Sequence, residues 1–238
     1  MKVCKLIFVL FACAMAPAQT IENIMDKAAE AAGFRAGAEI KTLYTGGQVS
    51  MPMGKGKIDN YRKQGGLVFT KTVFNGGQIE QTQACDGNDC YSQDSMMGLR
   101  LLEGHEKEML QLANDPSNEI KWRETYAKTE LVGKETLNDR SVYKVHLETP
   151  AGIKADRYYD AETYLILRED MTTNTPMGVL TAITNYKKYT DIHNGYLVAA
   201  EMDMTMMNMT MNITLDLENV EIDAPIPDSK FSLPAGLK

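Results

Sequence analysis

Methionine recurs at regular spacing near the C-terminal end of the sequence, in the segment 202–217. Apolar residues occupy the even positions up to Met206 and the odd positions from Met207 onward. Because successive strand side chains point to opposite faces, this change of phase predicts a turn or a bulge at Met207-Asn208. One face of the resulting ladder would carry the residues that we call the methionine face: Met202, Met204, Met206, Met209, Met211, Ile213 and Leu215.

Three chemistries are compatible with the methionine face. Methionine is flexible and fills irregular gaps, so the face can be packed core. The same flexibility suits a deformable apolar cavity for acyl chains. Thioethers also select copper(I), although such a site needs exposed ligands, and His193 is the only histidine in this part of the chain.

Cys85 and Cys90 flank the short segment Asp86-Gly87-Asn88-Asp89. In an oxidising compartment, two cysteines on either side of a turn predict a local disulfide. A zinc site would need further ligands, and His105 is the only histidine nearby in the sequence. The spacing differs from the C-x-x-C of redox enzymes, so we interpret the disulfide as structural.

The sequence contains no recognisable catalytic motif. It lacks a G-x-S-x-G elbow, an H-E-x-x-H helix, a Walker loop and a dinucleotide fingerprint. The three histidines, His105, His146 and His193, belong to unrelated segments. We therefore expect a protein that is not an enzyme and that uses no cofactor and no metal.

Residues 1–18 have the pattern of an export signal. Lys2 and Lys5 precede an uncharged apolar stretch, residues 6–14, which is too short to span a bilayer, and small residues then favour cleavage after Ala18. The alternative is a lipobox that ends at Cys13, which would make the protein lipid-anchored. Cleavage removes two lysines and no acid, so the formal charge changes from -7 to -9.

This acidic balance narrows the classes of partner. An acidic chain lacks the basic surface that nucleic acid requires, and it disfavours electrostatic docking on anionic lipid. No second apolar run is long enough to cross a membrane. The length after residue 18 suits a single domain with a sizeable core.

Periodicity predicts a mainly β protein of the α+β class. Residues 20–32 and 103–114 have helical spacing, whereas the rest of the chain alternates with a period of two. One large antiparallel sheet with helices against one face fits this order. The predicted strands are 40–51, 57–63, 67–74, 78–85, 90–93, 129–135, 141–148, 155–159, 164–172, 180–189, 196–206 and 210–222.

Five local patterns follow one another along the chain. They are the strand 58–63 with Arg62 near its end, the D-G turn at 86–91, the G-x-R-x-L-x-G-x-E run at 98–106, the Tyr-Tyr-Asp hairpin at 158–165, and Tyr186-Lys187-Lys188-Tyr189 with Asn194-Gly195. In this order they resemble the outer-membrane lipoprotein-sorting family, the LolA-like proteins. The resemblance covers most of residues 19–238.

The resemblance implies an unclosed, curved antiparallel β half-barrel, with helices as a lid on the concave face. It implies a single periplasmic lipid-binding domain, residues 19–238, which acts as a monomer. The expected ligands are the acyl chains of lipids or lipoproteins, exchanged with a membrane-bound donor or acceptor protein during outer membrane biogenesis. The methionine face would line the cavity.

The family's second-strand arginine, which contacts the lid and gates the cavity, corresponds to Arg62. Lys63-Gln64 follows here in place of the family's usual proline, and the cysteine pair and the methionine face are also departures from it. A copper(I)-binding protein and a structural or interaction module with a filled core are the alternative functions.

Overall fold

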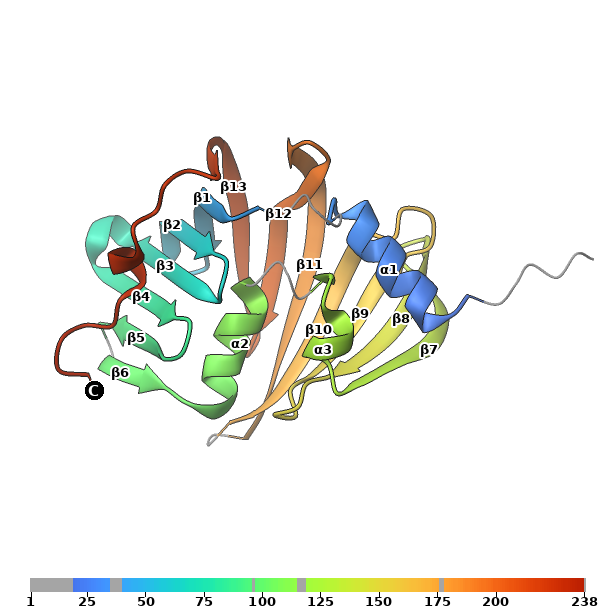
Figure 1. Ribbon diagram of the computed structural model, residues 1–238, viewed down its shortest axis with the longest axis horizontal. Coiled ribbons are helices and arrows are strands. Elements are labelled where there is room, and N and C mark those ends of the chain that lie inside the picture. The colour runs from blue at the N-terminus through green and yellow to red at the C-terminus, as the bar shows by residue number, and fades with distance from the viewer. Residues whose placement is uncertain (1–18, 35–39, 96, 115–118, 176–177, 238) are drawn as a thin grey trace, which may run out of the picture.

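A computed structural model describes residues 19–34, 40–95, 97–114, 119–175 and 178–237 (Figure 1). The predicted export signal, residues 1–18, and Cys13 lie outside these ranges. The structure therefore bears on the domain that follows the predicted cleavage site.

In the described ranges, thirteen strands form one antiparallel sheet in the order β6-β5-β4-β3-β2-β1-β13-β12-β11-β10-β9-β8-β7. The strand order is sequential except that β1 pairs with β13, which joins the two halves of the chain at the centre of the sheet. The sheet is curved and is not closed, because β6 and β7 are its two edges (Figure 1). The predicted fold class, a mainly β α+β half-barrel, is confirmed.

The strand boundaries follow the predicted pattern closely, and the exception is β6. This strand lies within the G-x-R-x-L-x-G-x-E run at 98–106, where alternation predicted no strand. The strands are β1 (Thr42–Met51), β2 (Gly54–Lys63), β3 (Leu67–Phe74), β4 (Ile79–Asp86), β5 (Cys90–Asp94), β6 (Gly98–Leu102), β7 (Lys128–Leu137), β8 (Arg140–Glu148), β9 (Lys154–Asp160), β10 (Ile166–Thr175), β11 (Gly178–His193), β12 (Tyr196–Met206) and β13 (Met209–Ile222).

The change of phase within the methionine segment is a hairpin turn between β12 and β13. Met207 and Asn208 both have positive φ, 50° and 62°, as a two-residue turn between twisted antiparallel strands requires. Met206 therefore pairs with Met209, and Met204 with Met211. The sequence prediction of a turn at this point is confirmed.

Two short helices pack over the β7–β10 half of the sheet (Figure 1): α1 (Ile21–Ala31) and α3 (Trp122–Thr125). Thr20 caps α1 by accepting a hydrogen bond from the Asn23 backbone N–H at 3.2 Å. Asp26 of α1 accepts hydrogen bonds from Trp122 and Arg123 of α3, each at 3.0 Å. These contacts join the two helices above a shared core with Ile24, Met25, Val145, Leu147 and Tyr159.

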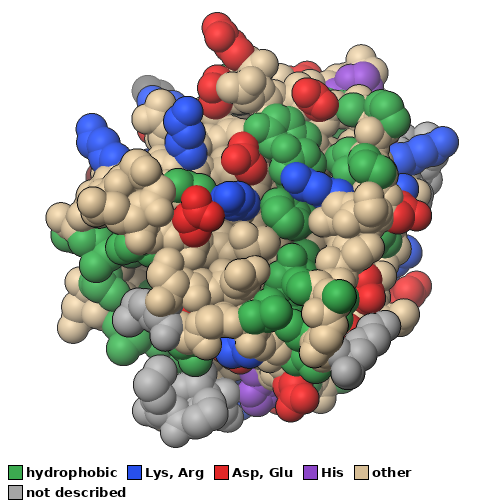
Figure 2. Space-filling model, turned by 90° about the vertical axis from the view of Figure 1, so that its left-hand side faces the viewer, with side chains coloured by type: hydrophobic (Ala, Val, Ile, Leu, Met, Phe, Trp, Pro, Cys, Tyr) green, Lys and Arg blue, Asp and Glu red, His purple; other side chains and the backbone are tan. Residues whose placement is uncertain are grey.

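The C-terminal segment packs on the outer face of β3 and β4 through the 3₁₀ turn η3 (Asp228–Phe231). Phe231 is fully buried, and the Lys230 ammonium lies 4.2 Å from the centroid of the Tyr61 ring. A second 3₁₀ turn, η1 (Asn75–Gly77), joins β3 to β4. Figure 2 views this side of the molecule, where hydrophobic and charged side chains are interspersed.

Helix α2 (Gly104–Asn114) lies on the concave side of the sheet above a second core cluster. Leu110 of α2 packs on Val68 and Leu102, and on the disulfide between Cys85 and Cys90. These cysteines face each other directly across β4 and β5, and neither is exposed. The disulfide predicted from the sequence is confirmed and forms part of the base on which α2 rests.

Replacing both cysteines by serine is expected to destabilise the protein by about 2 kcal/mol, the loop-entropy value for a ring of this size. Urea unfolding of the wild type with and without a reductant measures the contribution of the disulfide to the free energy of unfolding. The Cys85→Ser, Cys90→Ser variant is the matched control, because a reductant should leave its midpoint unchanged. Equal midpoints for the oxidised and reduced wild type would contradict the expectation.

Candidate ligand-binding cavity

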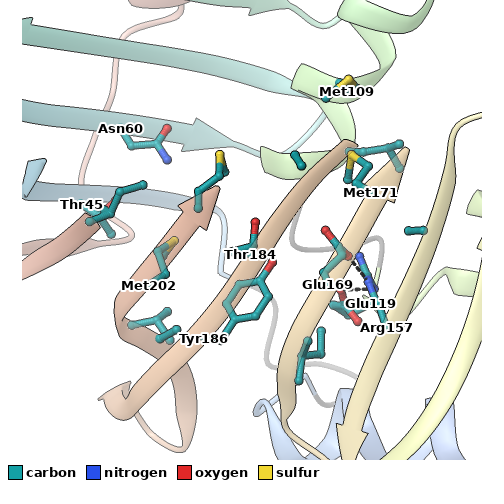
Figure 3. Close-up of a pocket in the computed structure, with 18 of the residues that line it drawn as sticks. Thr45, Asn60, Met109, Glu119, Arg157, Glu169, Met171, Thr184, Tyr186 and Met202 are labelled. Atoms are coloured by element: carbon teal, nitrogen blue, oxygen red, sulfur yellow. Dashed lines mark hydrogen bonds and ion pairs between the residues drawn. The ribbon is translucent and has the colours of Figure 1, made fainter. Parts of the chain in front are cut away.

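A cavity of about 440 Å³ opens between the concave face of the sheet and α2. Its walls come from both halves of the chain: from β1 and β2 on one side, and from β9 to β13 on the other. Met109 and Leu112 of α2 and Glu119 from the link before α3 also line the cavity (Figure 3), as do Phe34, Tyr126, Thr149 and Ile153 from other connecting segments. The lining is mostly apolar.

Three rows of side chains cross this wall from β9 to β13, because residues paired directly across antiparallel strands share one face. The first row is apolar, the second begins with charges and ends in methionine, and the third joins an aromatic ring to aliphatic groups. The rows are Ala155-Met171-Ala182-Met206, Arg157-Glu169-Thr184-Met204 and Tyr186-Met202-Ile213.

The structure divides the methionine face. Its members on the cavity wall are Met202, Met204, Met206, Ile213 and Leu215. Met209 and Met211 lie directly opposite Met206 and Met204 on β13 but are not part of the lining. Met209 is 45% exposed. The strand to which each methionine belongs, β12 or β13, separates the two groups, and alternation alone does not report this.

Arg62 of β2 lines the opposite wall of the cavity. With the Asn60 amide oriented to satisfy its neighbours, its oxygen accepts a hydrogen bond from Arg62 Nη2 at 2.9 Å, and its nitrogen donates to Thr70 at 3.0 Å. Arg62 thus has the position on the second strand that the family resemblance implies. Its role as a gate remains a prediction.

A buried ion cluster at Arg157 is the feature that sequence reasoning missed. Arg157 Nη1 donates to Glu119 Oε1 at 2.9 Å, and Arg157 Nε donates to Glu169 Oε2 (Figure 3). The three side chains are only 11%, 20% and 8% exposed, respectively. The sequence did contain a signal for this cluster. Arg157 is a charged residue that shares one face of β9 with the apolar Ala155 and Tyr159, the face expected to point inward.

The surroundings keep the guanidinium charged and the nearby phenols neutral. Burial opposes the charge of Arg157, but the attraction of Glu119 and of the other acidic groups raises its pKa well above the ordinary value. Burial raises the pKa of Tyr126 to about 12, and it also raises that of Tyr186. The phenols of Tyr126 and Tyr186 therefore add no charge to the cluster at neutral pH.

The histidines lie apart from the cavity and from one another. His193 ends β11 and pairs with Tyr196, which lies about 34 Å from Met206 along β12. His105 contacts the Ala151 carbonyl, and His146 pairs with Asp156. Within the described ranges, no group of three or more His, Cys, Asp or Glu side chains could hold a metal ion.

None of the helices in the described part of the chain is both long enough and apolar enough to cross a membrane.

No protein-family model and no curated protein matches this sequence. Solved structures do match. A DUF1329 family protein from Desulfovibrio piger has a TM-score of 0.60 at 13% identity, over 89% of this chain and 97% of that one. A domain assigned to outer membrane lipoprotein sorting, from Vibrio parahaemolyticus, has a TM-score of 0.60 at 11% identity, with the same coverages.

A LolA superfamily protein from Nitrosomonas europaea has a TM-score of 0.61 at 13% identity, over 91% of this chain and 99% of that one. These values show a shared fold across nearly the full length of each structure. The fold is the LolA-like half-barrel that the order of motifs resembled.

Proposed function

We propose that this chain is a non-catalytic periplasmic carrier that holds acyl chains of lipids or lipoproteins in the cavity of its half-barrel. The observation that carries the proposal is a cavity of about 440 Å³ with a mostly apolar lining, in a fold shared with a domain assigned to lipoprotein sorting. In this proposal residues 1–18 direct export, and residues 19–238 act as one monomeric domain.

The physical basis is the burial of methylene groups. Each buried methylene contributes about 0.8 kcal/mol, so an apolar cavity binds a long chain more tightly than a short one. The flexible side chains of Met202, Met204 and Met206 let the wall adapt to chains of different shape. Release to a membrane-bound acceptor then requires competition for the cavity, for which α2 and Arg62 are the candidates.

The two alternative functions fit less well. A filled core would leave no space between the sheet and α2, where the cavity lies. Copper(I) would have to be bound by thioethers on the cavity wall without His193, which ends β11 opposite Tyr196 at the start of β12. Lipid anchoring through Cys13 would turn the diffusing carrier into a tethered receptor with the same cavity.

Binding of fluorescent acyl probes is expected to strengthen with chain length, by about fourfold in affinity for each added methylene until the cavity is full. Titration of the delipidated protein with probes of increasing length measures this slope. Mass spectrometry of protein purified from membrane-containing cells is expected to find bound lipid. The absence of both probe uptake and co-purified lipid would refute the carrier function.

A further inference from the structure

The ion cluster on the cavity wall has more negative than positive charge. Arg157 contributes one positive charge, whereas Glu119 and Glu169 contribute two negative charges. Each carboxylate is paired through a single oxygen. The second oxygen of each accepts no hydrogen bond from the described part of the chain, and both side chains border the cavity.

The groups around the cluster are aromatic or neutral. Tyr126, Tyr186 and Tyr189 line the same part of the cavity, and the Arg157 guanidinium lies 5.7 Å from the centroid of the Tyr126 ring. Thr184 pairs directly with Glu169 across the strands. Aromatic faces beside carboxylates are the surroundings in which proteins bind organic ammonium ions.

One further charged residue lies on the wall within the described ranges, namely Arg62 on β2. Four strands separate β2 from β10 in the sheet, which is about 24 Å along the curved surface. Asn60 already accepts a hydrogen bond from Arg62. The excess negative charge therefore belongs to the Arg157 side of the cavity, next to the methionines of β12.

We propose that this cluster binds the ammonium group of the ligand, so that the carrier prefers acyl or alkyl chains that end in a protonated amine. An uncompensated charge in an apolar cavity is unfavourable, and an ammonium ion would neutralise it while donating to the two available carboxylate oxygens. The ligand's chain would then run along the row from Thr184 to Met204. This inference rests on the proposed carrier function.

An anionic head group would be repelled by the same cluster. A carboxylate or phosphate would meet two carboxylates, and it would reach Arg157 only by displacing Glu119 or Glu169. The two possibilities predict opposite orders of affinity for ligands that differ only in the head group. Removal of one carboxylate should weaken the binding of an ammonium ligand and strengthen the binding of an anionic one.

The experiment compares three probes of equal chain length, dodecylamine, dodecanol and dodecanoate, as competitors of a fluorescent acyl probe. With the wild type, the amine is expected to bind about tenfold more tightly than the alcohol, as a hydrogen-bonded charge pair provides, and the acid more weakly than the alcohol. Glu119→Gln is expected to bring the amine and the alcohol to equal affinity.

Glu124→Gln is the matched control, because Glu124 is an exposed residue of α3 that is not part of the cavity lining. It removes the same charge from the protein and should keep the preference for the amine. Glu169→Gln is the second test variant, and thermal melts confirm that each variant is folded. Loss of the preference in Glu124→Gln as well would assign it to the overall charge and overturn the proposal.

Three further outcomes test the proposed preference for an ammonium group. Dodecanoate binding most tightly, and more tightly still in Glu119→Gln, would replace the ammonium ligand by an anionic one. Equal affinity for all three probes would overturn the head-group selection and leave the carrier function standing. Absence of dodecanol binding would instead count against the carrier function itself.

The ammonium group has two natural sources, and paired ligands distinguish them. For a lipid head group, lysophosphatidylethanolamine should compete better than lysophosphatidylglycerol of the same chain length. For a lipid-modified peptide, a free amino terminus should compete better than the acetylated form. A preference in neither pair would limit the inference to simple amines and exclude both sources.

Discussion

Replacing Ala182 by tryptophan is expected to weaken acyl-chain binding by roughly 60-fold while leaving the protein folded. Ala182 is half-buried on the cavity wall, between Met171 and Met206 in the first row. An indole at this point would fill space that a ligand chain occupies. Loss of room for three methylenes corresponds to about 2.4 kcal/mol of binding free energy.

The control for this prediction is Met209→Trp. Met209 lies directly opposite Met206, but it is 45% exposed and is not part of the cavity lining. Titration with a fluorescent acyl probe should give wild-type affinity for Met209→Trp and a large loss for Ala182→Trp. Equal affinities in the two variants would show that the acyl chain binds elsewhere.

Replacing Asp160 by alanine is expected to destabilise the protein by about 3 kcal/mol. Asp160 ends β9 and is 2% exposed. Its Oδ1 accepts hydrogen bonds from the Thr163 N–H at 2.8 Å, the Thr163 hydroxyl at 2.9 Å and the Glu162 N–H at 3.2 Å. Hydrogen bonds to a charged acceptor contribute about 1.5–3 kcal/mol each, and neighbouring ones are not additive.

Replacing Asp160 by asparagine distinguishes the contribution of the charge from that of the hydrogen bonds to the free energy of unfolding. Asp160→Asn keeps an oxygen for all three donors but loses the charge and the pairing of Oδ2 with Arg140. Its expected cost is about 1.5 kcal/mol, half that of alanine. Urea unfolding at neutral pH measures both variants. The exposed Glu162→Gln in the same turn is the control and should leave the midpoint unchanged.

The contribution of Asp160 also depends on pH. Although burial alone would raise the pKa of this carboxyl group, the hydrogen bonds from Thr163 and Glu162 hold it below its ordinary value. The stabilisation is therefore complete above the unfolded pKa of about 3.9, and it is lost as the pH falls through the folded pKa. The difference between the wild type and Asp160→Asn should narrow below about pH 4. A constant difference down to pH 2 would contradict this.

Local pattern was sufficient to predict much of the fold. Alternation predicted the strands, and the phase change in the methionine segment predicted the turn at Met207-Asn208, where the structure has it. The short spacing of Cys85 and Cys90 predicted a disulfide that forms across β4 and β5. Each of these features depends on residues close together in the chain, so neighbouring sequence carries the information.

The strand β6 was missed for a local reason as well. Gly98–Leu102 has only five residues, and alternation predicted no strand between 90–93 and the helix expected at 103–114. It pairs with β5 on one side and forms an edge of the sheet. Pairing with a neighbouring strand, and not intrinsic preference, decides the conformation of such a segment.

The sequence by itself determined which residues alternate, where the chain turns, and that one face of the last hairpin is rich in sulfur. Only the tertiary structure decided which of those sulfurs reach the cavity, because this depends on where β12 and β13 cross the concave face. The pairing of β1 with β13 and the meeting of Arg157 with Glu119 and Glu169 are likewise non-local. Such contacts form between residues distant in sequence, whose proximity depends on the curvature and register of the whole sheet.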